Sequence, residues 1–222
     1  MRTSDQDHRR KAVGTLLGLP LAAAAVAALA PSPAQAARGT QDKDSAALQK
    51  RLDQLEARQQ ITDVLYRYAR GWDLLDEQML RSCFFDDAQH QHGGYKGQSQ
   101  DFITIALPVV AKTRSTSHAI SNVFIELRGD AAVADCYFFA HHRRNNAEGT
   151  DEEDYFLGGR YLDRFEKRDG VWKIARRRGL NSLERVVPRA DRSFARAAAD
   201  SFVGRTPDDP FYAFLAELDA KP

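Results

Sequence analysis

Three side chains of this sequence have types that suit acid–base chemistry: Tyr68, Asp73 and His118. Asp73 follows Gly71-Trp72 at the end of a helical pattern, and His118 stands near the start of a strand pattern. A carboxylate that holds a histidine fixes its tautomer and stabilises its imidazolium form, so the other ring nitrogen can take a proton near neutral pH. The spacing alone leaves open whether Asp73 is that carboxylate or an exposed helix end, and whether Tyr68 is only a core aromatic.

Four further histidines offer a metal-binding alternative. His90 and His92 alternate with other residues along one strand pattern, so they share a face, and His141 or His142 would complete a zinc or iron site. No third ligand stands at a diagnostic spacing, and the same pattern fits the polar rim of a sheet. We therefore assign no metal and no cofactor.

Arginines provide the candidate contacts to an anionic or polar substrate. The runs 143–144 and 176–178 lie in strand patterns, where alternate members face opposite sides, so solvated faces are the default expectation. Arg160 follows Gly158-Gly159, which permits close packing, and we expect it to enter a pocket.

Composition limits the function classes. The chain has 222 residues, 43% of them hydrophobic and 28% charged, which fits one domain with extensions. With 32 Lys and Arg against 31 Asp and Glu, there is no whole-molecule basis for nucleic-acid binding. Two cysteines exclude a disulfide scaffold, and we expect Cys83 and Cys136, both in apolar surroundings, to be separate buried thiols.

Residues 1–36 have the pattern of an export signal. Arg9-Arg10-Lys11 precedes an uncharged Ala- and Leu-rich run, and Ala34-Gln35-Ala36 resembles a cleavage site. The paired arginines suggest the twin-arginine route, and a transmembrane anchor is the alternative. We expect a periplasmic protein, cleaved near Ala36 and free of the membrane afterwards. Cleavage removes four basic and two acidic residues from the totals of 32 and 31, which leaves 28 against 29.

Helical patterns dominate the next part of the chain. A linker is expected over 37–47, a helix from about Ser45 to Trp72, a short helix over 76–85 and a helix over 98–112, with a polar strand over 87–92. The first long helix is predicted from apolar residues at three- and four-residue steps, with one longer step from 55 to 61: Leu48, Leu52, Leu55, Ile61, Leu65, Tyr68 and Trp72.

Strand patterns follow over 115–127, 131–144, 153–168 and 171–186. Asp169-Gly170 suits a tight hairpin that would set Phe165 opposite Ile174. Helices followed by an antiparallel meander indicate an α+β domain, in which a strongly bent sheet with helices on its concave side encloses a pocket. Residues 188–222 are expected to form a helical extension, with helices over 191–200 and 208–219 and a role as a cap or interface.

An ordered set of short motifs resembles the SnoaL-like branch of the nuclear-transport-factor-2-like superfamily over residues 48–187. The motifs are Ile61-Thr62-Asp63-Val64-Leu65-Tyr66-Arg67-Tyr68-Ala69-Arg70-Gly71-Trp72-Asp73, Phe85-Asp86-Asp87-Ala88, Tyr95-Lys96-Gly97, Ser117-His118 and the segment from Gly159 to Ile174. The resemblance implies a cone of curved antiparallel sheet, closed by N-terminal helices around a deep pocket. Its members include hexachlorocyclohexane dehydrochlorinase, scytalone dehydratase and bile acid 7α-dehydratase.

The resemblance also assigns roles. The Asp–His dyad of the dehydrochlorinase matches Asp73 and His118, and the bile acid enzyme has a tyrosine where Tyr68 stands. The dehydrochlorinase has a lysine at that position, so a halogenated substrate is not favoured here. Within the expected pocket we assign substrate binding to Trp72, His141, Arg160 and Tyr161.

The leading hypothesis is a cofactor-independent lyase, either a dehydratase or a carbon–carbon lyase. It would act on a hydrophobic, cyclic or aromatic small molecule through Asp73, His118 and Tyr68. Alternatives are an isomerase or cyclase of the same fold, a metal-dependent enzyme, and a non-catalytic module that binds a ligand or pairs subunits. Relatives often form dimers or trimers, so the resemblance implies a homodimer or homotrimer.

Overall fold

The computed structural model describes residues 33–191 and 201–219. The chain divides into two units, residues 1–45 and 46–222, and the fold below is that of the second. Most of the predicted export signal and nearly all of the predicted helix over 191–200 lie outside the described residues. Both remain predictions.

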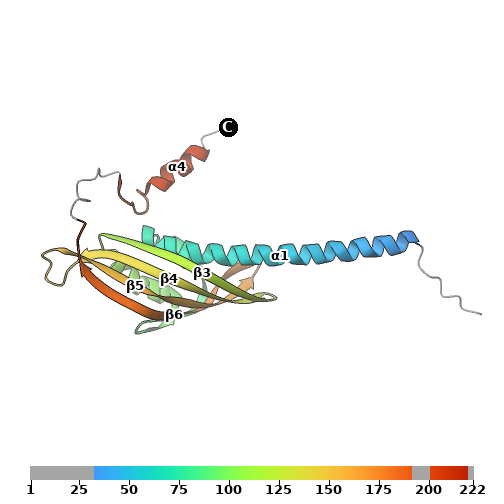
Figure 1. The fold of residues 1–222 in the computed structure, drawn as a ribbon, viewed down its shortest axis with the longest axis horizontal. Coiled ribbons are helices and arrows are strands. Elements are labelled where there is room, and N and C mark those ends of the chain that lie inside the picture. The colour runs from blue at the N-terminus through green and yellow to red at the C-terminus, as the bar shows by residue number, and fades with distance from the viewer. Residues whose placement is uncertain (1–32, 192–200, 220–222) are drawn as a thin grey trace, which may run out of the picture. The chain divides into compact units, whose positions relative to one another are not determined.

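One six-stranded sheet with helices forms the second unit (Figure 1). Along the chain the elements are α1 (Pro33–Leu74), α2 (Glu77–Ser82), β1 (Phe84–His92), β2 (Tyr95–Gln98), α3 (Ser99–Val110), β3 (Ser115–Arg128), β4 (Ala131–Asn145), β5 (Glu152–Arg168), β6 (Val171–Pro188) and α4 (Pro210–Asp219). The strand order is β2-β1-β6-β5-β4-β3. The α+β prediction is confirmed. The short strand β2 was not predicted, and β1 pairs with β6 in parallel rather than antiparallel fashion.

The start of α1 differs from the expectation. Residues 37–47, predicted as a linker, are helical, because α1 begins at Pro33. Alanine, glutamine and lysine in this stretch favour a helix, and extending a helix that is already nucleated costs little.

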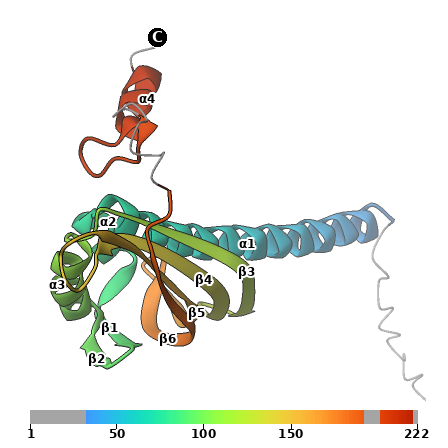
Figure 2. The same ribbon diagram turned by 60° about the vertical axis from the view of Figure 1, so that its left-hand side comes forward.

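The strands alternate between a buried concave face and an exposed convex face. Along β4, for example, Ala132, Ala134, Cys136, Phe138 and Ala140 are buried while the residues between them are not. Figure 2 shows that the sheet is strongly curved and that α3 lies beside β1 and β2. The second half of α1 supplies the opposing layer of the core through Ile61, Val64, Leu65, Tyr68 and Trp72.

The β5–β6 hairpin forms as predicted. Asp169 and Gly170 have φ of 52° and 81°, which a two-residue turn of this hand requires. Phe165 pairs with Ile174 across the strands, and both side chains are fully buried. This hairpin therefore fixes the register of the core end of the sheet.

A one-residue β-bulge interrupts the β3–β4 ladder. Ser121 pairs with Tyr137 and Phe124 with Asp135, so two residues of β3 face one residue of β4. Asn122 within the bulge has a φ of 50°. Because a one-residue offset moves side chains to the other face, the bulge decides which residues of β4 share a face with the start of β3.

The end of α1 is closed by a tight turn. The amide N–H of Asp76 donates to the carbonyl of Gly71 at 2.9 Å, and that of Leu75 donates to Trp72 at 3.3 Å. This pattern is a Schellman cap, with Leu75 in the left-handed region at φ 54°. Asp73 thus stands in the last turn of α1, where its direction is set by a closed backbone.

The turn is fixed from its other side by α2. Asp76 caps α2 by accepting from the N–H of Met79 at 2.8 Å. A Cβ on Gly71 would come within 2.9 Å of the Leu80 side chain, so glycine allows α2 to pack against α1.

A buried ion pair lies on the concave face between β5 and β6. Arg177 donates to both carboxylate oxygens of Asp163, at 2.8 Å and 2.6 Å, and both side chains have 0% exposure. The guanidinium lies 4.0 Å from the Tyr68 ring centroid and 4.2 Å from that of Tyr161. Burial lowers the pKa of Arg177 and the Asp163 carboxylate raises it; the net direction is upward, so the guanidinium stays charged.

Both cysteines are free and buried, as predicted. Burial raises the pKa of Cys83 to about 11 and that of Cys136 to about 12. Both groups are therefore thiols at neutral pH.

The C-terminal segment returns to the end of α1. The N–H of Thr206 donates to the Leu74 carbonyl at 3.0 Å, and Arg205 donates to the carbonyl of Thr113 at 2.9 Å. Arg70 lies 4.3 Å from the ring centroid of Phe211 at the start of α4. No helix within the described residues is long and apolar enough to cross a membrane.

Replacing Asp163 with Asn tests the buried pair. The change leaves the Arg177 charge without its partner, so we expect a loss of about 3–5 kcal/mol in the free energy of unfolding, measured by urea denaturation. Glu166→Gln is the control: its partners Arg164 and Arg168 are more than one third exposed, so it should cost less than about 1 kcal/mol. Equal losses in the two variants would contradict this account.

Candidate functional site

The site is built around Asp73 and His118. Asp73 Oδ1 lies 2.7 Å from His118 Nδ1, and Asp73 Oδ2 accepts the backbone N–H of His118 at 3.1 Å. One carboxylate therefore holds both the ring and the main chain of the same residue. With Nδ1 engaged, Nε2 is the ring nitrogen that can exchange a proton with a bound molecule.

The dyad is only partly accessible. The His118 side chain is 9% exposed and that of Asp73 is 29% exposed. Asp73 also stands at the C-terminal end of α1, where the helix dipole places partial negative charge. The carboxylate and the helix end therefore both place negative charge next to the His118 ring.

A second imidazole stands beside the first. The ring centroids of His118 and His142 are 5.3 Å apart and the rings are nearly perpendicular. His142 Nδ1 lies 2.8 Å from the hydroxyl of Thr116, which shares the concave face of β3 with His118. Burial, and then the neighbouring charge of His118, lower the pKa of His142 to about 4, so this ring is neutral at neutral pH.

A second histidine pair lies on β1. His92 Nε2 is 3.0 Å from Oδ1 of Asn181, and its ring stacks on that of His90 at 6.2 Å. Burial lowers the pKa of His92, and the bond to Asn181 opposes that shift. His90 stacks on Phe102 at 4.0 Å, and neither of its ring nitrogens has a hydrogen-bond partner. Burial lowers the pKa of His90 to about 2, so it is a neutral aromatic residue of the core.

Aromatic side chains fill the neighbouring concave face. Tyr68 contacts Trp72, Phe84 and Tyr161 edge-on, at centroid distances of 5.9, 5.6 and 5.7 Å. Tyr161 also stacks on Phe138 at 4.3 Å. Tyr68 is fully buried; burial raises its pKa and the nearby Arg177 opposes the rise, so its hydroxyl stays protonated. Among the predicted site residues, Trp72 and Tyr161 therefore join Tyr68 in one cluster.

The structure does not bring Arg160 or His141 to the dyad. His118 pairs with Ala140 across the ladder, so even-numbered residues of β4 share its face and His141 lies on the other. Arg160 pairs with Tyr137, also on the convex face, and donates to Asp135 at 2.8 Å.

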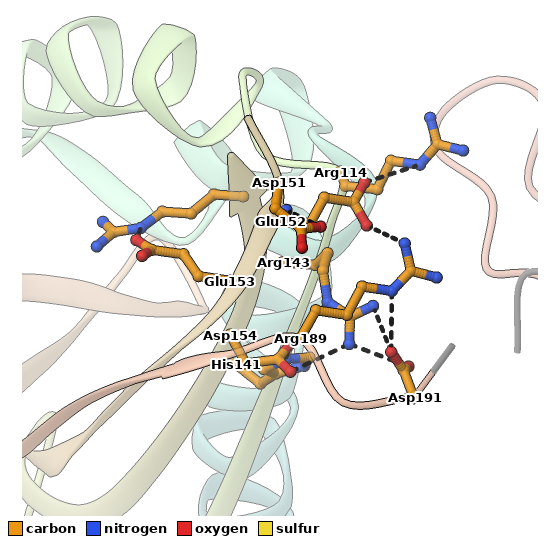
Figure 3. A network of polar contacts seen from close by, with 10 residues as sticks. Arg114, His141, Arg143, Asp151, Glu152, Glu153, Asp154, Arg189 and Asp191 are labelled. Atoms are coloured by element: carbon orange, nitrogen blue, oxygen red, sulfur yellow. Dashed lines mark hydrogen bonds and ion pairs between the residues drawn. The ribbon is translucent and has the colours of Figure 1, made fainter. Parts of the chain in front are cut away.

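His141 belongs instead to a charged network on the convex face (Figure 3). Its Nε2 lies 2.6 Å from Asp154, which also accepts from Arg143 at 2.7 Å. Arg143 also donates to Asp191 at 3.0 Å, and Asp191 accepts a second hydrogen bond from Arg189 at 3.0 Å. The described residues therefore include a His–Asp pair on each face of the sheet.

The structure shows no metal site among the described residues, and a cleft that it does show lies apart from the dyad. Within the described part of the chain, no group of three or more His, Cys, Asp or Glu side chains is arranged to hold a metal ion. A cleft of about 350 Å³ lies between α1 and the hairpin turns, where Lys50, Asp130 and Trp172 are among its lining residues. None of the lining residues belongs to the dyad.

A comparison with known protein families identifies the domain that carries this site. Residues 53–178, more than half of the chain, match the model of the SnoaL-like domain. The chain belongs to the SnoaL-like domain family. A curated relative, "Terrestric acid biosynthesis cluster protein E" of Penicillium crustosum, is 28% identical over 124 residues, which cover 54% of this chain and 80% of the relative.

Solved structures show the same fold. Hexachlorocyclohexane dehydrochlorinase LinA-type3 from Novosphingobium barchaimii LL02 superposes with a TM-score of 0.54 at 24% identity, over 63% of this chain and 94% of that one. A nuclear transport factor 2 (NTF2-like) superfamily protein from Salmonella enterica serovar Typhimurium gives 0.51 at 17% identity, over 59% and 94%. These likenesses confirm the predicted NTF2-like fold.

Two residues beside the dyad, Thr116 and His142, and Asn181 beside His92 were not assigned to the site from the sequence. Thr116 and Asn181 have no motif of their own, and His142 was considered only as a metal ligand. The alternation of β3 alone places Thr116 with His118, since they are two residues apart. Placing His142 there requires the position of the bulge at Asn122, for which the sequence gives no clear signal.

Replacing His90 with Phe tests the neutral core histidine. The folded pKa of about 2 is far below the ordinary 6.5, so in acid the unfolded chain binds a proton that the folded chain does not. Stability is therefore lost as pH falls below about 6.5, by about 2–3 kcal/mol at pH 4.5 for this residue. Urea denaturation at both ends of that window should show a smaller acid loss in His90→Phe. An unchanged loss would contradict this account.

Proposed function

We propose that this protein is a lyase that acts on a hydrophobic cyclic or aromatic small molecule without a cofactor. The observation that carries the proposal is the Asp73–His118 contact at 2.7 Å, reinforced by the backbone bond at 3.1 Å. A histidine oriented in this way is a general base, and the paired carboxylate stabilises the imidazolium that forms. Family membership supports a small-molecule enzyme, since a dehydrochlorinase is among the structural neighbours.

Elimination of water is the simplest reaction that these groups support. Nε2 of His118 removes a proton from a carbon next to a carbonyl group, and the freed electron pair forms a carbon–carbon double bond as the bond to a β-hydroxyl breaks. Tyr68, kept protonated by its raised pKa, donates a proton to the departing oxygen, so the products are an enone and water. The water formed beside Tyr68 gives a proton back to the Tyr68 oxygen, and the resulting hydroxide takes the proton from His118, so both groups regain their starting forms. Retro-aldol cleavage of a carbon–carbon bond would use the same groups.

The surroundings support an uncharged, ring-shaped substrate. The concave face beside the dyad carries Trp72, Phe138 and Tyr161, and the nearby His142 is neutral at neutral pH. A neutral imidazole and the Asn181 amide supply hydrogen bonds without attracting a charged group. Aromatic side chains supply apolar area and stacking.

Replacing His118 with Ala, and separately Asp73 with Asn, tests the dyad. We expect kcat to fall about 10²–10⁴-fold in each, because the base or its orientation is lost. The assay offers a panel of cyclic β-hydroxy ketones with aromatic substituents and follows enone absorbance, with mass spectrometry to detect carbon–carbon cleavage. His141→Ala is the matched control, since it breaks the convex-face pair with Asp154. Equal losses in His118→Ala and His141→Ala would contradict the proposal.

Replacing Tyr68 with Phe tests the proton donor. The ring and its packing on Arg177 are kept and only the hydroxyl is removed, so kcat should fall at least about tenfold while KM changes little. Tyr137→Phe, on the exposed convex face, is the control and should leave both constants unchanged. A Tyr68→Phe enzyme with normal kcat would leave the dyad in place but remove Tyr68 from the mechanism.

A further inference from the structure

Helix α1 carries an exposed apolar stripe that the core does not use. Leu48, Leu52 and Leu55 are 66%, 45% and 65% exposed, and Tyr66 further along is 51% exposed. Large apolar side chains that gather on one exposed face usually mark an interaction surface.

The stripe lies opposite the face of α1 that packs on the sheet. At about 100° per residue, Leu48, Leu52, Leu55 and Tyr66 fall within about 60° of one another around the helix. The buried residues from Ile61 to Tyr68 centre on the other side of the helix. Because one face is already filled by the domain, the leucine stripe is available to a different partner.

The spacing of the stripe is that of a coiled-coil seam. Steps of four and then three residues from Leu48 to Leu55 match d, a and d positions of a heptad, and the next two positions are Gln59 and Thr62. Tyr66 takes the following a position. A polar residue at one a position is a common device for fixing register and strand number.

Charged residues beside the stripe select the partner and its direction. Arg51 and Glu56 occupy g and e positions five residues apart. In a parallel pair, g of one helix meets the following e of the other, so Arg51 would face Glu56 of a second copy, twice by symmetry. An antiparallel pair would instead set g against g and place cationic side chains together. Of the two g residues, Arg51 flanks the stripe, while Arg58 donates to the carbonyl of Ile125 in β3 at 2.5 Å.

We propose that residues 48–66 of α1 form a parallel coiled-coil seam with the same residues of a second copy of this chain. Arg51 and Glu56 are complementary to each other across such a pair, so the partner that fits this surface is a second copy of the same helix. The seam is formed by α1 alone and is separate from the convex face of the sheet. Its last residue, Tyr66, lies one heptad before Asp73 on the same side of the helix.

Leu52→Glu combined with Leu55→Glu, made in the full chain, tests the seam by analytical ultracentrifugation. Both residues are exposed, so the fold should survive, and self-association should weaken by about tenfold or more. Leu162→Glu, an exposed apolar residue of the convex sheet face, is the matched control and should leave the association constant unchanged. A monomeric parent chain, or dissociation by Leu162→Glu but not by the seam variant, would overturn the proposal.

A charge exchange tests the parallel register. Arg51→Glu and Glu56→Arg should each weaken self-association, because each sets like charges against one another. The two single variants mixed together, or both changes in one chain, should restore it. Failure of the mixture to associate better than either variant alone would overturn the parallel arrangement.

A cysteine placed in the seam gives a direct distance test. A parallel pair brings the two copies of residue 59 together, so Gln59→Cys should form a disulfide-linked dimer under mild oxidation. Gln54→Cys, about 120° around the helix from the leucine stripe, should not. The native cysteines are buried and should not compete. Equal crosslinking of both variants, or none, would count against the seam.

Discussion

The contact between Asp73 and His118 is the constraint on which the account of this molecule depends. One carboxylate at the end of α1 accepts from both the backbone and the ring of a residue on β3. Its position follows from the Schellman turn at Leu75 and from α2, which is capped by Asp76 and packs closely on Gly71. The chemistry proposed for the site is thus a consequence of how a helix ends.

Most of the fold follows from patterns in the sequence, while the face assignments near the site do not. Four long strands and their order along the chain were predictable from alternation, and Asp169-Gly170 fixed one hairpin because few residues tolerate its dihedral angles. The β3–β4 pairing was not predictable in the same way. A hairpin without a bulge would set His118 opposite His141, whereas the bulge at Asn122 shifts the ladder by one and brings His142 to the concave face.

Helix α1 shows what a break in periodicity can encode. The step from Leu55 to Ile61 is six residues, which turns the apolar pattern by about 240° around the helix. Before that step the leucines are exposed, and after it the apolar residues are buried against the sheet. A single amphipathic stripe was the simpler interpretation of the sequence. Instead, α1 has one apolar face that packs on the sheet of its own domain and a second, exposed apolar face that is suited to another partner. The buried ion pair of Arg177 and Asp163 was likewise not predictable from the sequence, since its formation depends on the register of β5 and β6.

The tautomer of His118 tests the central claim most directly. Nitrogen-15 NMR of the selectively labelled histidine ring distinguishes which nitrogen carries the proton in the neutral form. The Asp73 contact predicts a proton on Nδ1 and a free lone pair on Nε2, and Asp73→Asn should alter that preference. A neutral His118 protonated on Nε2 in the unaltered protein would contradict the account, because that nitrogen could not then act as the base.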